Sequence, residues 1–280
     1  MTEPRQPDEV TKAALEAVSE AVKIADEEEL PAEAQGRGLR GVARRRLARR
    51  AGRVSGDHRL RAALRRVASR SAHATAHGVG AGGRWLSGQV LAMAPRLPVR
   101  DLATLQSQFP GRGPDELADA LIEGAARASA AVGMAVGAWA VLPFVPAAGV
   151  EVMTETLSVV GIEIKLVAEL HEVYGQRAPG NVVDRMTAYV GAWASRRGVA
   201  LAPGGLVIAA GSPLARQLRR RLAARAGRSV FSLGPLLTGA AVGGAINRHE
   251  TRKLGRILSG DLRQRADYGT GWRETPSGTA

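Results

Sequence analysis

Hydrophobic residues recur at helical spacing along much of this chain. Within residues 149–174 the apolar positions include Val152, Leu157, Val160, Ile164, Val167 and Leu170. This spacing puts them on one face of an α-helix, and Gly175 is placed to end it. The same reasoning predicts helices over about 8–30, 114–127 and 181–197, the first of them with an acidic outer face.

Two stretches of the chain contain no charged residue, residues 128–150 and residues 229–247. Both are rich in Ala and Gly, and both are interrupted by Pro. The residues expected to mediate helix packing or membrane contact here are Gly133, Gly137, Gly239, Gly243, Pro143, Pro235 and Asn247. Glycines one turn apart let another backbone approach closely. We therefore predict that the Gly239/Gly243 face packs against the Gly133/Gly137 face, with Asn247 at a helix end bonding backbone groups.

These uncharged stretches are compatible with three environments: a buried core, a shallow or re-entrant membrane insertion, and a membrane crossing. Their lengths permit a crossing. The first stretch, however, contains only seven residues from Val, Leu, Ile and Phe, and its Pro and Gly residues oppose insertion. Arg228 and Arg248 flank the second stretch, which fits a hairpin or a buried helix better than a single crossing. A buried core is favoured, and the other two environments stay open.

Arginine is concentrated in two regions of the chain. Residues 36–70 hold thirteen Arg and a single acid, Asp57, and predict basic helices over about 38–51 and 57–77. A third basic helix is predicted over about 212–228. The expected anion-binding surface comprises Arg61, Arg65, Arg66, Arg216, Arg219 and Arg220. Such faces attract lipid headgroups, nucleic-acid phosphates or an acidic partner, unless they are merely solvated.

Composition narrows the choice between these partners. The 280 residues carry a formal net charge of +13, but only 4% are aromatic, and stacking on bases needs aromatic side chains. An anionic membrane surface or a membrane protein is therefore favoured over nucleic acid, which stays open. The absence of Cys excludes disulfides and thiolate zinc sites. The N-terminal residues lack a secretory pattern, so we expect a cytoplasmic protein, peripheral or re-entrant on the inner membrane face.

Candidate catalytic motifs are weak. Residues 78–83 match GxGxxG, but a dinucleotide site needs a strand before this motif, so we predict a flexible linker there. His73 and His77 lie one turn apart without a third ligand, which favours a surface pair over a metal site. The remaining candidates for an unrecognised site are Glu151, Glu155 and Glu169. We predict a protein without catalytic residues, metal, cofactor or small-molecule substrate.

Three segments together resemble the EcsC family of bacterial proteins. They are residues 142–148 (LPFVPAA) with Glu151 after them, residues 169–175 (ELHEVYG), and residues 234–247 (GPLLTGAAVGGAIN) followed by Thr251 and Gly255. The resemblance covers about residues 115–258 and implies a helical, membrane-associated protein without established chemistry. The family is named for a protein encoded beside an ABC exporter, which implies a membrane or transporter-type complex.

The sequence thus predicts an all-α fold, in which only residues 205–210 have the pattern of a short strand. The expected parts are an acidic helix or tail (1–35), an Arg-rich region (36–78), a Gly/Pro-containing linker (79–113), a helical domain (114–260) and a flexible tail (261–280). The expected function is non-enzymatic association with the cytoplasmic face of a membrane or with a membrane complex. The alternative is a soluble polybasic protein associated with nucleic acid.

Overall fold

The structure, a computed structural model, describes the helical core of the chain. The described residues are 6–27, 62, 79–139, 148–202, 205–208 and 236–268. Apart from residue 62, the predicted basic helices over 38–51, 57–77 and 212–228 lie outside them. So do His73, His77, Pro143, Pro235, Arg61, Arg65, Arg66, Arg216, Arg219 and Arg220. What the sequence predicts for these residues stays a prediction.

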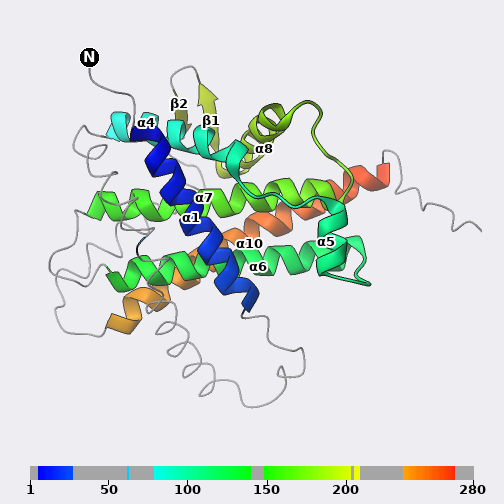
Figure 1. The fold of residues 1–280 in the computed structure, drawn as a ribbon, viewed down its shortest axis with the longest axis horizontal. Coiled ribbons are helices and arrows are strands. Elements are labelled where there is room, and N and C mark those ends of the chain that lie inside the picture. The colour runs from blue at the N-terminus through cyan, green and yellow to red at the C-terminus, as the bar shows by residue number, and fades with distance from the viewer. Residues whose placement is uncertain are drawn as a thin grey trace, which may run out of the picture.

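Three long helices form the centre of the molecule (Figure 1). They are α6 (Pro114–Trp139), α7 (Ala148–Val173) and α10 (Leu236–Tyr268). The contact between α6 and α10 is the most extensive in the described structure. Gly133 lies against Gly243, and Arg263 pairs with Asp115 at the other end, so these two helices are antiparallel. Both helices also pack against α7.

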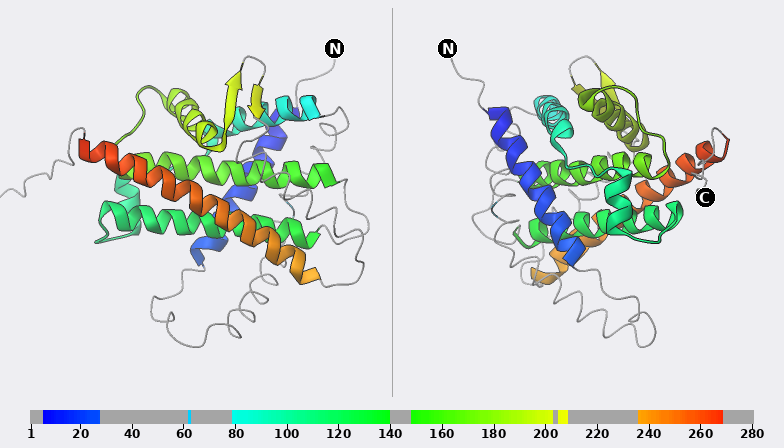
Figure 2. Two further views of the ribbon diagram at one scale, coloured as in Figure 1. Left: turned by 180° about the vertical axis from the view of Figure 1, so that it is seen from behind. Right: turned by 45° about the vertical axis from the view of Figure 1, so that its right-hand side comes forward.

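Two further helices cover one side of this bundle. α1 (Gln6–Glu27) packs across α6 and α7, and α4 (Val79–Met93) packs on both α1 and α7. The right-hand view of Figure 2 shows α1 crossing the long helices at a steep angle. A 3-10 turn, η2 (Ala94–Arg96), and a short helix, α5 (Leu102–Gln108), connect α4 to α6. This connection carries Arg100, which becomes important at the candidate site.

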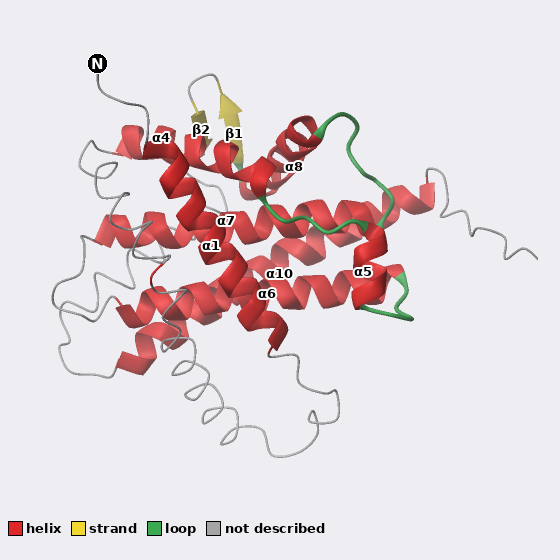
Figure 3. Ribbon diagram, in the orientation of Figure 1, coloured by secondary structure: helices red, strands yellow, loops and turns green. Residues whose placement is uncertain are grey.

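The remaining elements lie on α7 at the side away from α6. α8 (Val182–Arg197) packs against α7 and leads directly into a small antiparallel hairpin. Its strands are β1 (Val199–Ala202) and β2 (Gly205–Ile208), paired with Val199 opposite Ile208. Figure 3 shows this hairpin in yellow beside the helices in red. The strand suggested at 205–210 is thus present as β2, within a fold whose architecture is all-α, as predicted.

Local sequence signals account for several helix ends. Asn181 caps α8 by accepting hydrogen bonds from the backbone N–H groups of Val183 and Asp184, and the Asp184 carboxylate accepts one from the Asn181 N–H. Gly198 ends α8 in a left-handed conformation, with φ of 64°. Gly175 follows α7 with φ of 65°. These are the glycine stops that the sequence predicted for the two helices.

α7 is the central helix of the core. Every residue from Glu155 to Leu170 is buried, so this helix is enclosed on all sides. Apolar neighbours come from each surrounding helix and include Val18, Val90, Met93, Leu121, Trp193 and Leu258. A helix enclosed in this way is expected to be apolar all round. Yet Glu155, Glu163, Lys165 and Glu169 are buried along it, and buried charges require specific partners.

Two predictions of organisation are wrong. Residues 79–93 were expected in a flexible linker, but they form α4, and Leu86, Val90 and Met93 of this helix are buried. A glycine in a helix costs about 1 kcal/mol relative to alanine, and burial of three large side chains outweighs that penalty. Likewise, part of the expected tail from 261 onward is helical, because α10 continues to Tyr268 and buries Leu262.

The N-terminal helix belongs to the same core. Ala14, Ala17, Val18, Ala21 and Ala25 of α1 are buried against the bundle, so the predicted amphipathic helix is confirmed with slightly different ends. The segments expected at 1–35 and 79–113 therefore contribute helices to the core of the 114–260 domain. In the described residues, no helix has an apolar run long enough to cross a membrane.

Candidate functional site

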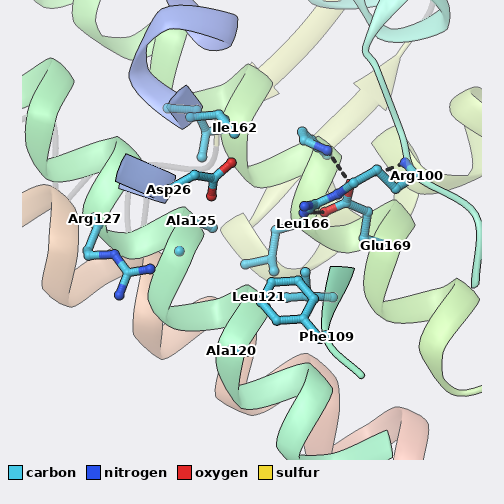
Figure 4. Close-up of a pocket in the computed structure, with 13 residues that line it drawn as sticks. Asp26, Arg100, Phe109, Ala120, Leu121, Ala125, Arg127, Ile162, Leu166 and Glu169 are labelled. Atoms are coloured by element: carbon cyan, nitrogen blue, oxygen red, sulfur yellow. Dashed lines mark hydrogen bonds and ion pairs between the residues drawn. The ribbon is translucent and has the colours of Figure 1, made fainter. Parts of the chain in front are cut away.

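A pocket opens between α1, α6, α7 and the segment around α5 (Figure 4). Its volume is about 460 Å³ when the solvent at its mouth is included. The apolar lining comes from Val22, Phe109, Leu121, Ala125, Ile162 and Leu166. The charged lining comes from Asp26, Arg100, Arg127, Lys165 and Glu169. Five ionisable side chains around an otherwise apolar space distinguish this place from the rest of the core.

Glu169 is the residue of the charged lining to which Arg100 and Lys165 both bind. Arg100 binds it with both ends of its guanidinium group: Nε lies 2.8 Å from Oε1, and Nη2 lies 2.8 Å from Oε2. The backbone N–H of Arg100 also donates to Oε1 at 3.2 Å. Lys165, one turn earlier on α7, pairs with the same carboxylate and donates to the carbonyl of Pro98 at 2.8 Å. Glu169 is thereby fully engaged by two cations.

The protonation of this cluster follows from burial and pairing. Burial raises the pKa of Glu169, but the hydrogen bonds from Arg100 and the charge of Lys165 outweigh burial and lower it. Burial lowers the pKa of Lys165, and the Glu169 carboxylate only partly offsets this effect. The pKa of Arg100 is raised, because its bonds to Glu169 exceed the opposing effect of burial.

Asp26 and Arg127 line the same pocket, and among the described residues neither is hydrogen-bonded to the Glu169 cluster, although the charge of Asp26 acts on Arg100 and Lys165. Figure 4 shows Arg127 toward one side of the pocket, the Arg100–Glu169 pair toward the other, and the carboxylate of Asp26 between them. Within the described part of the chain, the buried Nε of Arg127 has no hydrogen-bond partner. Burial raises the pKa of Asp26, and the charges of Arg100, Lys165 and Arg127 only partly offset this rise. Within the described residues, two opposite charges without a hydrogen-bonded partner therefore lie at the mouth.

A second buried cluster lies on the opposite face of α7. Glu163 accepts hydrogen bonds from Trp193 Nε1 at 2.9 Å and from Thr251 Oγ1 at 3.0 Å. Arg197 pairs with the same carboxylate and also with Glu250, whose Oε2 lies 3.3 Å from Nη1. Burial lowers the pKa of Arg197, but the charge of Glu163 outweighs it and raises the pKa. Because the three helices α7, α8 and α10 converge here, we interpret this cluster as structural.

The predicted contact between the two uncharged stretches is present at Gly133 and Gly243. A Cβ added to Gly133 would lie 2.6 Å from the Gly243 carbonyl oxygen, closer than real Cβ atoms approach. The two backbones therefore touch, which only glycine permits here. Gly137 and Gly239 lie in α6 and α10, but their surroundings fall outside the described side chains.

Asn247 bonds a backbone group as predicted, but its place in the helix differs. Its Nδ2 donates to the carbonyl oxygen of Ser129 at 3.2 Å and to Glu155 Oε1 at 2.8 Å. The expected helix end at Asn247 is wrong, because α10 continues for nearly six further turns, to Tyr268. Asn247 is fully buried in the middle of the helix and links α10 to both α6 and α7.

The three glutamates named as candidates separate in the structure. Glu155 binds Asn247 in the core, and Glu169 lines the pocket, whereas the side chain of Glu151 lies outside the described part. The sequence did not single out Asp26, Arg100 or Lys165 as partners of this site. The one available signal was the four-residue spacing of Lys165 and Glu169, which is common for surface pairs.

Comparisons with protein-family models, with curated proteins and with solved structures found no match. The resemblance to the EcsC family over about residues 115–258 therefore stays a prediction.

Proposed function

We propose that this chain is a non-enzymatic helical protein that binds the surface of an anionic membrane with one end of its helical bundle. The observation that carries the proposal is the placement of the uncharged stretches. α6 ends at Trp139, α7 begins at Ala148, and α10 begins at Leu236. These three helix ends lie at the same end of the bundle in Figures 1 and 2.

The two ends of the bundle differ in charge. In α6 and α10, residues 128–139 and 236–247 contain no charged residue. At the other end, Arg263 pairs with Asp115, Arg196 pairs with Asp261, and Arg177 pairs with Glu172. An end with few charges is the one that transfers to a lipid interface at the lowest desolvation cost. Although α7 brings Glu151 and Glu155 to this end, the uncharged ends of α6 and α10 support an orientation in which it faces the membrane.

The Arg-rich segments join the chain near this uncharged end. Residues 36–78 lead into α4 at Val79, and residues 212–228 precede α10 by seven residues. Each basic residue close to an anionic bilayer contributes about 1 kcal/mol, so several together bind firmly at low salt. Apolar helix ends next to basic segments are the combination expected of a peripheral membrane protein.

Vesicle co-sedimentation of the full chain tests this proposal. We expect the protein to sediment with phosphatidylglycerol-containing vesicles at low salt, to sediment poorly with pure phosphatidylcholine vesicles, and to be released by high salt. Phe144→Glu, in the uncharged connection between α6 and α7, is expected to reduce the bound fraction. The matched control is Val183→Glu, at an exposed position of α8 away from that end.

Arginine variants separate the electrostatic contribution from the apolar one. The variant combines Arg61→Gln, Arg65→Gln and Arg66→Gln. Each arginine that it removes should weaken vesicle binding by about 1 kcal/mol, roughly fivefold. The control Arg256→Gln, on α10, should leave vesicle binding unchanged. A protein that stays in the supernatant with anionic vesicles at low salt contradicts the proposal. A gel-shift assay with duplex DNA, run alongside, then tests whether nucleic acid is the partner instead.

A further inference from the structure

We propose that the pocket between α1, α6 and α7 binds a small zwitterion, a molecule that carries both an acidic group and a primary ammonium group. Arg127 would bind the acidic group, Asp26 would bind the ammonium group, and the apolar lining would contact the rest of the molecule. This site is separate from the membrane-facing end and does not depend on membrane binding.

The first step of the argument is that Glu169 is not available to a ligand. It is almost fully buried, and it receives the two parallel hydrogen bonds of Arg100, a backbone hydrogen bond and the ion pair with Lys165. Arg100 and Lys165 are in turn occupied by Glu169 and by the oxygens of Gln108 and Pro98. These three charges form a closed unit that fixes the inner wall of the pocket.

The second step concerns Arg127 and Asp26, which remain outside this unit. The buried Nε of Arg127 has no hydrogen-bond partner within the described residues, and a buried donor left unpaired costs about 1–3 kcal/mol. The carboxylate of Asp26 lies between Arg127 and the Arg100–Glu169 pair in Figure 4 and also lines the pocket. The groups available to a ligand are therefore one donor and one acceptor of opposite charge. A molecule that satisfies both must carry both charges.

The apolar lining and the shape of the pocket limit the size of the ligand. Phe109, Leu121 and Ala125 lie between the two charged sides in Figure 4. The enclosed part of the pocket has room for a few water molecules. A ligand must therefore be small, and part of it must extend toward the mouth. An α-amino acid with a short apolar side chain has this size and this chemistry, as does the phosphoethanolamine group of a zwitterionic lipid.

Thermal unfolding of the full chain with a matched series of probes tests the proposal. Valine carries both charges, isovalerate lacks the ammonium group, and isobutylamine lacks the carboxylate, while the apolar part is the same. Free phosphoethanolamine tests the lipid-headgroup source. A ligand that binds only the folded state raises the midpoint of unfolding in a concentration-dependent way. We expect a saturable rise with valine or phosphoethanolamine, and at least a tenfold higher concentration requirement for isovalerate and isobutylamine.

Variants assign the effect to the two side chains. Arg127→Gln and Asp26→Asn are each expected to abolish the rise, whereas Arg256→Gln and Asp119→Asn, at exposed positions of α10 and α6, should retain it. Circular dichroism of each variant establishes that it is folded, and an unfolding midpoint without ligand provides the baseline. Because no vesicles are present, failure here leaves the membrane proposal unaffected.

Three results would overturn this inference. The first is that neither valine nor phosphoethanolamine raises the midpoint of the native protein at millimolar concentration. The second is that isovalerate acts as well as valine, which would make the pocket a site for simple anions. The third is an unchanged response to valine and phosphoethanolamine in both Arg127→Gln and Asp26→Asn, which would place binding elsewhere on the molecule.

Discussion

The two faces of α7 carry similar charges but use them differently. On the face toward α8 and α10, Glu163 is enclosed by Trp193, Arg197 and Thr251, and the surrounding helices touch closely. On the face toward α1, Glu169 is equally well paired, but its cluster borders a pocket. The comparison indicates that pairing alone does not identify a functional site. What distinguishes the second face is the space beside it and the charges that remain available.

The largest effect is expected from breaking the cluster around Glu163. Arg197→Met leaves this buried carboxylate without its cation, which costs about 3–5 kcal/mol in the free energy of unfolding. Urea denaturation measures the change. The neighbouring Arg196→Met removes an arginine that pairs with Asp261 near the surface, where the cost is about 0–1 kcal/mol. Equal losses in the two variants would contradict the structural role given to the Glu163 cluster.

The next effect concerns Glu169 and depends on pH. Glu169→Gln removes hydrogen bonds to charged partners, which costs about 1.5–3 kcal/mol at pH 7. Because the pKa of Glu169 is lower in the folded protein, its stabilisation is complete above the unfolded value of about 4.3 and is lost as the pH falls through the folded value. The difference between variant and parent should therefore shrink in acid.

Denaturation at a series of pH values measures this difference. Glu172→Gln is the control, since Glu172 pairs with the half-exposed Arg177 and should cost less than about 1 kcal/mol. A difference between Glu169→Gln and the parent that is constant from pH 7 to acid would show that the charge of Glu169 contributes nothing to stability.

A pair of glycine substitutions on α6 compares its tight contact with α10 with its looser packing beside the pocket. Gly133→Ala places a methyl group 2.6 Å from the Gly243 carbonyl oxygen, so we expect a loss of about 1–3 kcal/mol. The methyl group of Gly124→Ala, at the pocket, would lie 4.0 Å from Arg127 Nη2, at an ordinary contact distance. There the better helix propensity of alanine should stabilise the protein by about 0.5–1 kcal/mol. Thermal unfolding of both variants distinguishes the faces, and equal effects would contradict this comparison.

The smallest effect is expected at the mouth of the pocket. Burial raises the pKa of Asp26, so the folded state binds a proton more readily than the unfolded state, and ionised Asp26 opposes folding near neutral pH. Asp26→Asn should therefore raise the free energy of unfolding slightly, by about 0.5 kcal/mol or less. The gain should disappear as the pH falls below the folded pKa. A loss of stability at pH 7 would mean that Asp26 already has a partner.

The sequence by itself determined the helices and many of their ends. Hydrophobic spacing predicted α1, α6, α7 and α8, and the glycine stops at Gly175 and Gly198 followed from their freedom to adopt a positive φ. The close approach of Gly133 and Gly243 was also predictable, because small residues at helical spacing are useful only when another backbone lies near. The helices and their ends depend on neighbours along the chain, and the glycine contact depends on a local pattern of small residues in each helix.

The tertiary structure alone decided which charges meet. Arg100 binds Glu169 across 69 positions, and Asn247 binds Ser129 across 118. The sequence around α4 predicted a linker, because its glycines disfavour a helix until the core supplies apolar contacts. The pocket could not be predicted from the sequence either. Asp26, Arg127 and Glu169 come from three helices, and the sequence around each of them is typical of a helix surface. Packing brings residues together that are distant in the sequence, so the local sequence pattern around each residue does not predict its partner.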